Sequence, residues 1–186
     1  MASLYIVLGL LIIILAWVIS IYNSLVRLRQ HIQDSWSGIE TELRRRYDLI
    51  PNLVETVKGY AAHEKVVFER VVAARTRAAD STGSPSSQAA DENVLVQGLR
   101  QLFAVSESYP ELKASQNFLE LQKELANTED RIQAARRFYN GNVRDLNTRI
   151  EIFPSNLVAS LFNFKRAEYF EIEEVAATQA PGVDLN

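Results

Sequence analysis

The chain has 186 residues, a net charge of −3 and no cysteine. A nearly neutral chain has no general attraction for nucleic acid, and a chain without cysteine has no disulfides, thiolate metal ligands or cysteine nucleophiles. We therefore expect neither a nucleic-acid partner nor a cysteine-based active site. The most informative segment is residues 4–22, which contain no charged side chain.

Residues 4–22 predict a membrane-spanning helix. At 1.5 Å per residue they cover about 29 Å, which is close to the thickness of the hydrocarbon core of a bilayer. A cleaved signal peptide is one alternative, but no Lys or Arg precedes the run and bulky residues fill its end. A buried core helix is the other, although such a long core helix without a polar interruption is unusual. We interpret residues 1–26 as a retained single-span anchor in the lipid bilayer.

The charges beside the span predict its orientation. The N-terminal flank carries only the α-amino group, whereas Arg27 and Arg29 follow the span. Lys and Arg concentrate on the cytoplasmic side of membrane proteins. We therefore expect the N-terminus outside and the soluble part in the cytoplasm.

Apolar residues continue at helical spacing from Leu25 to Ala61, with an average step of 3.6 residues. No Gly-, Pro- or Ser-rich linker separates them from the span, so we expect one long helix that reaches about Ala79. Pro51 lies inside this helix and removes one backbone hydrogen bond. Because the spacing keeps its register across Pro51, we predict a kink there, with a break into two helices as the alternative.

The rest of the chain completes an all-α prediction. A Gly-, Pro- and Ser-rich loop at residues 80–91 precedes a helix over about 89–107. Ser84-Pro85 is an alternative start for that helix, because proline suits the first helical position. A long helix over 112–150 ends before Pro154, and a short one covers 157–164. We predict an antiparallel bundle of three or four helices over residues 27–165. An acidic tail at 166–186 should follow, disordered from Gln179 onward.

The sequence contains no catalytic or metal-binding motif. Its two histidines, His31 and His63, lack the spacing to glutamate that di-iron bundles and zinc enzymes use, so we expect no bound metal. Seven glycines form no phosphate-binding motif, and we expect no cofactor. A hydrolase that pairs a histidine with a Ser or Thr is the least favoured class.

Two groups of polar residues stand out. The run Arg44, Arg45 and Arg46 concentrates positive charge, but consecutive helical residues point about 100° apart. Acidic residues at 40, 42 and 48 favour local ion pairs over nucleic-acid binding. The long C-terminal helix carries several polar residues among apolar ones, which should form hydrogen bonds between helices or line a small-ligand pocket. These residues are Glu129, Asn140, Asn142 and Asn147.

Four stretches of the chain resemble the LemA family. They are YNSLVRLRQHIQDSWSGIETELRRRYDLIPNLVETVKGYAAHE at residues 22–64, ESYPELKASQNFLELQKEL, TEDRIQAARRFYNGNV and FPSN. The resemblance covers nearly the whole chain apart from the Ser-rich loop and the acidic tail. It implies a bacterial-type inner-membrane protein with one N-terminal span, a small N-terminus outside and a helical bundle. It also implies a link to membrane shaping or assembly, and it provides no catalytic residues.

We therefore expect a non-enzymatic, membrane-anchored scaffold that binds copies of itself or another membrane protein. Its candidate interaction surface lies within residues 36–63, because this helix is patterned for longer than one core requires. The residues are Trp36, Arg44, Arg45, Tyr47, Pro51, Tyr60 and His63. The alternative is a regulatory module that senses a small ligand between helices near Asn140 and Asn147.

Overall fold

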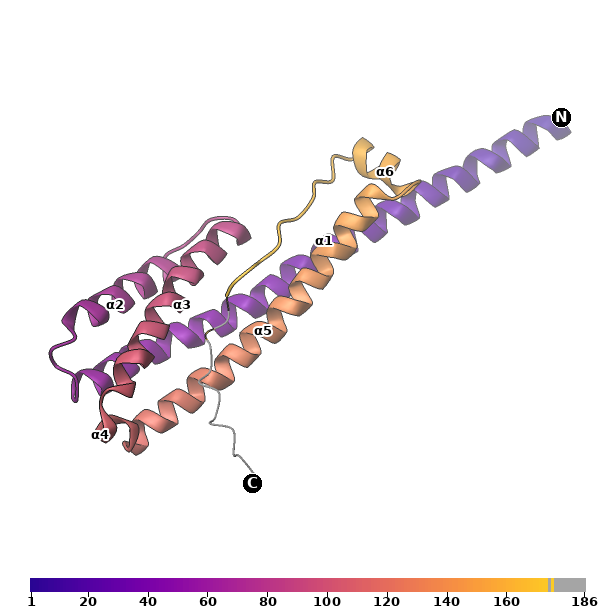
Figure 1. Ribbon diagram of the computed structural model, residues 1–186. Coiled ribbons are helices and arrows are strands. Elements are labelled where there is room, and N and C mark those ends of the chain that lie inside the picture. Colours follow the sequence, from indigo (N-terminus) through magenta and orange to yellow (C-terminus); the bar gives the residue numbers. More distant parts are fainter. Residues whose placement is uncertain (174, 176–186) are drawn as a thin grey trace, which may run out of the picture. The chain divides into compact units, whose positions relative to one another are not determined.

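The computed structural model describes residues 1–173 and 175, and its helices confirm the all-α prediction (Figure 1). No strand occurs in this part of the chain. The helices are α1 (Ala2–Lys58), α2 (Lys65–Ala79), α3 (Pro85–Glu107), α4 (Pro110–Lys113), α5 (Gln116–Glu151) and α6 (Ser155–Leu161).

The chain divides into two compact units. The first comprises Met1–Ser37 and Arg137–Tyr169, and the second comprises Gly38–Arg136 and the segment that begins at Phe170. Both α1 and α5 continue from one unit into the other, so each unit contains a part of each of these helices.

The N-terminal part of α1, in the first unit, is apolar and exposed. Apart from Gly9 and Val18, every residue from 1 to 20 is exposed, and only 6% of the most apolar stretch is buried. A core helix would bury such a stretch, so that alternative is wrong. By length and composition the helix can cross a membrane. The exposure of this apolar stretch agrees with the predicted membrane span.

In the first unit, α1 packs antiparallel to the C-terminal part of α5. The rings of Trp36 and Tyr139 lie 5.3 Å apart, and Asn142 Nδ2 donates to the backbone oxygen of His31 at 3.3 Å. Residues later in α1 thus contact residues earlier in α5. The second contact confirms that an asparagine of α5 forms a hydrogen bond between helices.

In the second unit, parts of α1 and α5 pack with α2 and α3 around an apolar core (Figure 1). Helix α3 packs on α2 at Gly98, where a Cβ would make ordinary van der Waals contact with Val71 Cγ2 at 3.4 Å. Thr56 and Asn117 join α1 to α5 by a side-chain hydrogen bond of 3.2 Å. Buried core residues include Ile39, Leu43, Ile50, Leu53, Val57, Phe68, Val71, Leu95, Leu99, Leu102, Leu125 and Ile132.

Pro51 lies inside α1 without ending it, so the alternative of two helices that meet there is wrong. Proline has no N–H, and the carbonyl of Tyr47, four residues earlier, therefore loses its helical donor. Arg75 of α2 replaces that donor, with its Nε 3.0 Å from Tyr47 O. The proline thus leaves an acceptor on α1 that α2 uses.

The first helix ends earlier than expected, at Lys58 rather than near Ala79. Gly59 follows, and glycine is the weakest helix former after proline. The N–H groups of Tyr60 and Ala61 both bond to Val57 O, at 3.0 and 2.9 Å, and these bonds form a turn. Ala61 continues the apolar spacing because it is buried in this turn, not because the helix persists.

Three other predicted boundaries are also wrong. The loop expected at 80–91 is confined to residues 80–84, because α3 begins at Pro85, and this start confirms the alternative at Ser84-Pro85. The polar residues Gln88 and Asp91, which had been assigned to the loop, are buried in α3. The helix expected over 112–150 is divided into α4 and α5, with a break at Ala114 and Ser115. The short helix expected over 157–164 is α6, which ends at Leu161.

The segment after α6 is extended and packs closely in both units. Asn147 exchanges two hydrogen bonds with the backbone of Ala167, at 3.0 and 2.8 Å, in the first unit. Phe170 is fully buried and Ile172 is 6% exposed in the second. The acidic composition of 166–186 did not indicate this packing. The disorder predicted from Gln179 onward lies outside the described residues.

Candidate functional site

The most unusual feature of the second unit is a charged network in its core. Arg46 of α1 is fully buried, and its Nη1 donates to both carboxylate oxygens of Glu129 on α5, at 3.0 and 3.1 Å. Its Nη2 donates to Oε2 of Glu92 on α3. The Glu92 side chain is also fully buried, and that of Glu129 is 11% exposed. One guanidinium therefore joins three helices.

Neutral groups complete the network around Glu92. The hydroxyl of Tyr47 and the Nε2 of Gln88 both donate to Glu92 Oε1, the latter at 2.8 Å. Gln88 also donates to the backbone oxygen of Ala78, at the end of α2, at 3.0 Å. All four principal helices of the unit thus contribute a group to one set of hydrogen bonds. Buried charges need such partners, because transfer from water is costly.

The electrostatics keep Arg46 ionised. Burial alone would lower the pKa of this guanidinium, but the charges of Glu129 and Glu92 outweigh burial and raise the pKa above its ordinary value. For Tyr47, burial is the largest cause and the Glu92 carboxylate the next, and both raise the pKa of the phenol. Tyr47 therefore remains a neutral donor at neutral pH.

The hydrogen bonds of the network join the helices of the second unit to one another. Two surface hollows of the second unit are lined by other residues, one beside Phe103 and Phe118 and one beside Val67 and Tyr109. Arg46 Nε is buried without a hydrogen-bond partner. Among residues 1–173 and 175, no three His, Asp or Glu side chains gather as a metal ion would need.

The predicted interaction surface is only partly available. Arg44, Arg45, Pro51, Tyr60 and His63 are exposed in the second unit. Tyr47 was wrongly included, because it is 8% exposed and bonds to Glu92 in the core. Trp36 belongs to the first unit, where it is half-buried against Tyr139.

Sequence reasoning missed Arg46, although a signal was present. Arg46 lies three residues after Leu43 and four before Ile50, so it shares their apolar face. Glu92 and Glu129 occupy equivalent positions, three residues before Leu95 and Ile132 respectively. Charges of opposite sign at core positions of separate helices predict a buried ion pair, whereas the expectation of local pairs along α1 was wrong for Arg46.

Of the polar residues proposed for ligand binding, Asn142 and Asn147 are bonded within the first unit. Asn147 is 4% exposed, and both ends of its amide bond to Ala167. Tyr139 OH donates to the backbone oxygen of Glu168 at 2.9 Å, and burial, followed by the charge of Glu168, raises the pKa of Tyr139 to about 12. These groups fix the segment after α6 on α5, which weakens the case for a ligand site near Asn147.

Comparison with known proteins identifies the family. Two magnetosome proteins MamQ of Paramagnetospirillum magneticum are each 28% identical to the chain over 175 residues, which cover 81% of it and 64% of their own length. Protein LemA of Metamycoplasma hominis is 26% identical over 153 residues, covering 82% of the chain and 70% of that protein. The chain thus spans about two thirds of the length of these MamQ relatives. The family model for LemA matches residues 35–185. These matches confirm the resemblance, and the chain belongs to the LemA family.

Proposed function

We propose that this protein is a non-enzymatic, membrane-anchored scaffold that binds copies of itself or another membrane protein. One observation carries the proposal: a single uninterrupted helix, α1, provides both an exposed apolar stretch and a core element of the second unit. An anchor that continues into a packed unit can hold that unit at a membrane without a flexible linker. The proposed setting is the inner membrane, with the N-terminus outside and the second unit in the cytoplasm.

The chemistry of the described residues supports a binding role. The charged groups in the core of the second unit are bonded to one another and not directed at a cavity. Exposed Arg44 and Arg45 remain on α1 as contacts for a partner. Relatives named for the magnetosome, a cellular structure and not a reaction, agree with a part in membrane organisation.

The test is photo-crosslinking of the full chain in cells, with the crosslinker at Arg45. We expect a discrete crosslinked species, either a dimer of the chain or an adduct with one membrane protein. Charge reversal of Arg44 and Arg45 together should weaken the crosslink, whereas reversal of exposed Lys113 and Lys123 provides the matched control. A chain that stays monomeric by light scattering in detergent and crosslinks to nothing would refute the scaffold.

Orientation is tested separately by protease protection. Protease added to spheroplasts, from which the outer layers have been removed, should leave the second unit uncut, and protease added after the inner membrane is opened should digest it. Digestion in intact spheroplasts would reverse the proposed orientation without affecting the binding role.

A further inference from the structure

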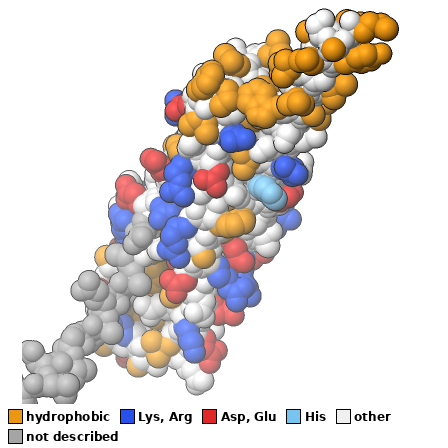
Figure 2. All heavy atoms as spheres, turned by 90° about the vertical axis from the view of Figure 1, so that its right-hand side faces the viewer, with side chains coloured by type: hydrophobic (Ala, Val, Ile, Leu, Met, Phe, Trp, Pro, Cys, Tyr) orange, Lys and Arg blue, Asp and Glu red, His pale blue; other side chains and the backbone are white. Residues whose placement is uncertain are grey.

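The first unit carries a second apolar surface besides the anchor. It consists of α6, whose sequence SNLVASL has no charged residue, and the turn that precedes it. Val158 and Ala159 face inward and are buried, whereas Phe153 is 77% exposed, Leu157 60% and Leu161 75%. Figure 2 shows apolar side chains gathered toward one end of the face in view, and charged ones of both signs elsewhere on that face. A contiguous exposed apolar surface marks an interaction site.

This surface adjoins the end of the anchor. Tyr22 is the last residue of the predicted membrane-spanning segment, residues 4–22. Its ring lies 4.8 Å from the ring of Phe162 and 5.8 Å from that of Phe164. Aromatic rings of membrane proteins gather at the level of the headgroups. The contacts of Tyr22 therefore place the residues that follow α6 beside the end of the predicted span.

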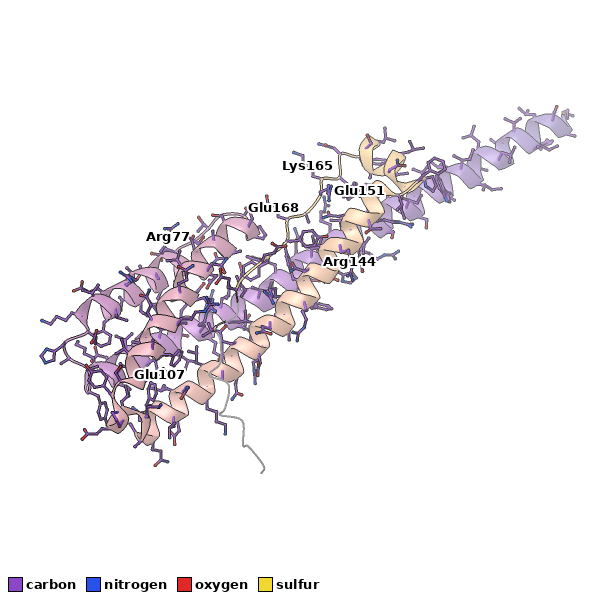
Figure 3. All side chains as sticks on the ribbon, viewed as in Figure 1. Arg77, Glu107, Arg144, Glu151, Lys165 and Glu168 are labelled. Carbon is purple, nitrogen blue, oxygen red and sulfur yellow. The ribbon has the colours of Figure 1, made fainter. Side chains whose placement is uncertain are left out.

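Basic side chains border the same surface. The guanidinium of Arg29 lies 5.4 Å from the centre of the Phe164 ring. Lys165 and Arg166 follow directly, and Arg166 pairs with Glu151 at 2.9 Å. Figure 3 shows Glu151 at the end of α5. Lys and Arg beside an apolar surface are attracted to anionic headgroups.

We propose that α6 and the turn before it form a second membrane contact, which inserts Phe153, Leu157 and Leu161 among anionic phospholipids at the interface. Phospholipid is the occupant because the surface is continuous with the anchor through Tyr22 and is bordered by basic residues. The contact turns a single-point anchor into a two-point attachment of the first unit. This proposal rests on the membrane anchor alone, and does not require that the protein binds itself or another protein.

The test uses the absence of cysteine in the chain, which allows one fluorophore at one position. Leu161→Cys places it on the proposed contact, and Arg144→Cys on α5 of the same unit, where the side chain is 72% exposed, is the matched control (Figure 3). The full chain is reconstituted in vesicles of phosphatidylcholine mixed with phosphatidylglycerol. Quenching by nitroxide-labelled lipids and reduction by aqueous dithionite are measured for both labels. Circular dichroism verifies that both variants keep the parent's helicity.

We expect the label at 161 to be quenched by nitroxide lipids and reduced several-fold more slowly than the label at 144. Vesicles of phosphatidylcholine alone should lower the lipid quenching. Equal reduction rates for the two labels would overturn the proposal. A label at 161 that is protected from dithionite but not quenched by nitroxide lipids would also overturn it, if the protection disappears when the protein is diluted among more vesicles. A second copy of the chain would then cover α6. Neither result would affect the crosslinking test of the scaffold.

Discussion

Removal of Arg46 should be among the most damaging single changes in the second unit. Arg46→Met leaves Glu92 fully buried and Glu129 nearly so, with no positive partner. Breaking a buried ion pair in this way costs about 3–5 kcal/mol. Since the whole unfolding free energy of a domain is about 5–15 kcal/mol, the loss is a large fraction of its stability.

Neutralising the two glutamates should restore most of the unfolding free energy that Arg46→Met loses. The triple variant Arg46→Met, Glu92→Gln and Glu129→Gln removes the unpaired charges, so its unfolding free energy should lie within about 2 kcal/mol of the parent. Arg45→Met is the matched control, because this exposed neighbour should change stability by no more than about 0.5 kcal/mol.

The assay is urea unfolding of the full chain in detergent micelles, followed by far-ultraviolet circular dichroism. The apolar part of α1 remains helical in the micelle and contributes a constant signal. A cost below about 1 kcal/mol for Arg46→Met would refute the inference that the network stabilises the unit. A triple variant no more stable than the single one would refute the inference that unpaired carboxylates cause the loss.

Three other perturbations test separate contacts. Arg75→Met should cost about 1–3 kcal/mol of unfolding free energy. It should cost clearly less in a Pro51→Ala background, where the backbone N–H restored at position 51 can bond to Tyr47 O. Additive effects in urea unfolding of the parent, the two single variants and the double variant would contradict this. The unfolding free energy should fall as pH rises from about 10, the pKa of an unfolded tyrosine, toward 12, because the unfolded chain releases the tyrosine proton first. The Tyr139→Phe variant should lack this part of the fall. Parallel pH profiles of parent and variant would exclude Tyr139 as its source. Phe170→Ala should cost about 3–5 kcal/mol in the same unfolding assay, because the ring is fully buried, and an unchanged midpoint would show that the segment after α6 does not stabilise the second unit.

Helical periodicity predicted the parts of the fold that local physics decides. The 3.6-residue spacing from Leu25 to Ala61 correctly identified one buried face along α1, and Ile39, Leu43 and Val57 are all buried. The same pattern misplaced the end of α1, because a buried turn residue continues an apolar spacing as well as a helical residue does. Spacing therefore identifies which side chains are buried better than it identifies where a helix ends.

The partners of the charged network could not be predicted from the sequence alone. Nothing local distinguishes Arg46 from Arg44 and Arg45 except its register with the apolar face of α1. The partners on α3 and α5 are 46 and 83 residues away, and their assignment requires knowing which helices are neighbours. Burial of Phe170 was equally hidden, because an extended segment has no helical period and its composition is mainly acidic.

The position of Phe170 has a consequence for biosynthesis. The other elements of the second unit are complete once Arg136 has been synthesised, but its core lacks one fully buried aromatic side chain until residue 170 is added. At about 5–20 residues per second the intervening stretch takes about 2–7 s to translate. During this interval the unit has its helices but lacks the side chain that fills one apolar site in its core. We expect pulse proteolysis of ribosome-bound chains, lengthened by a C-terminal linker so that residue 170 can leave the exit tunnel, to change from rapid to slow cleavage only after Phe170 has emerged.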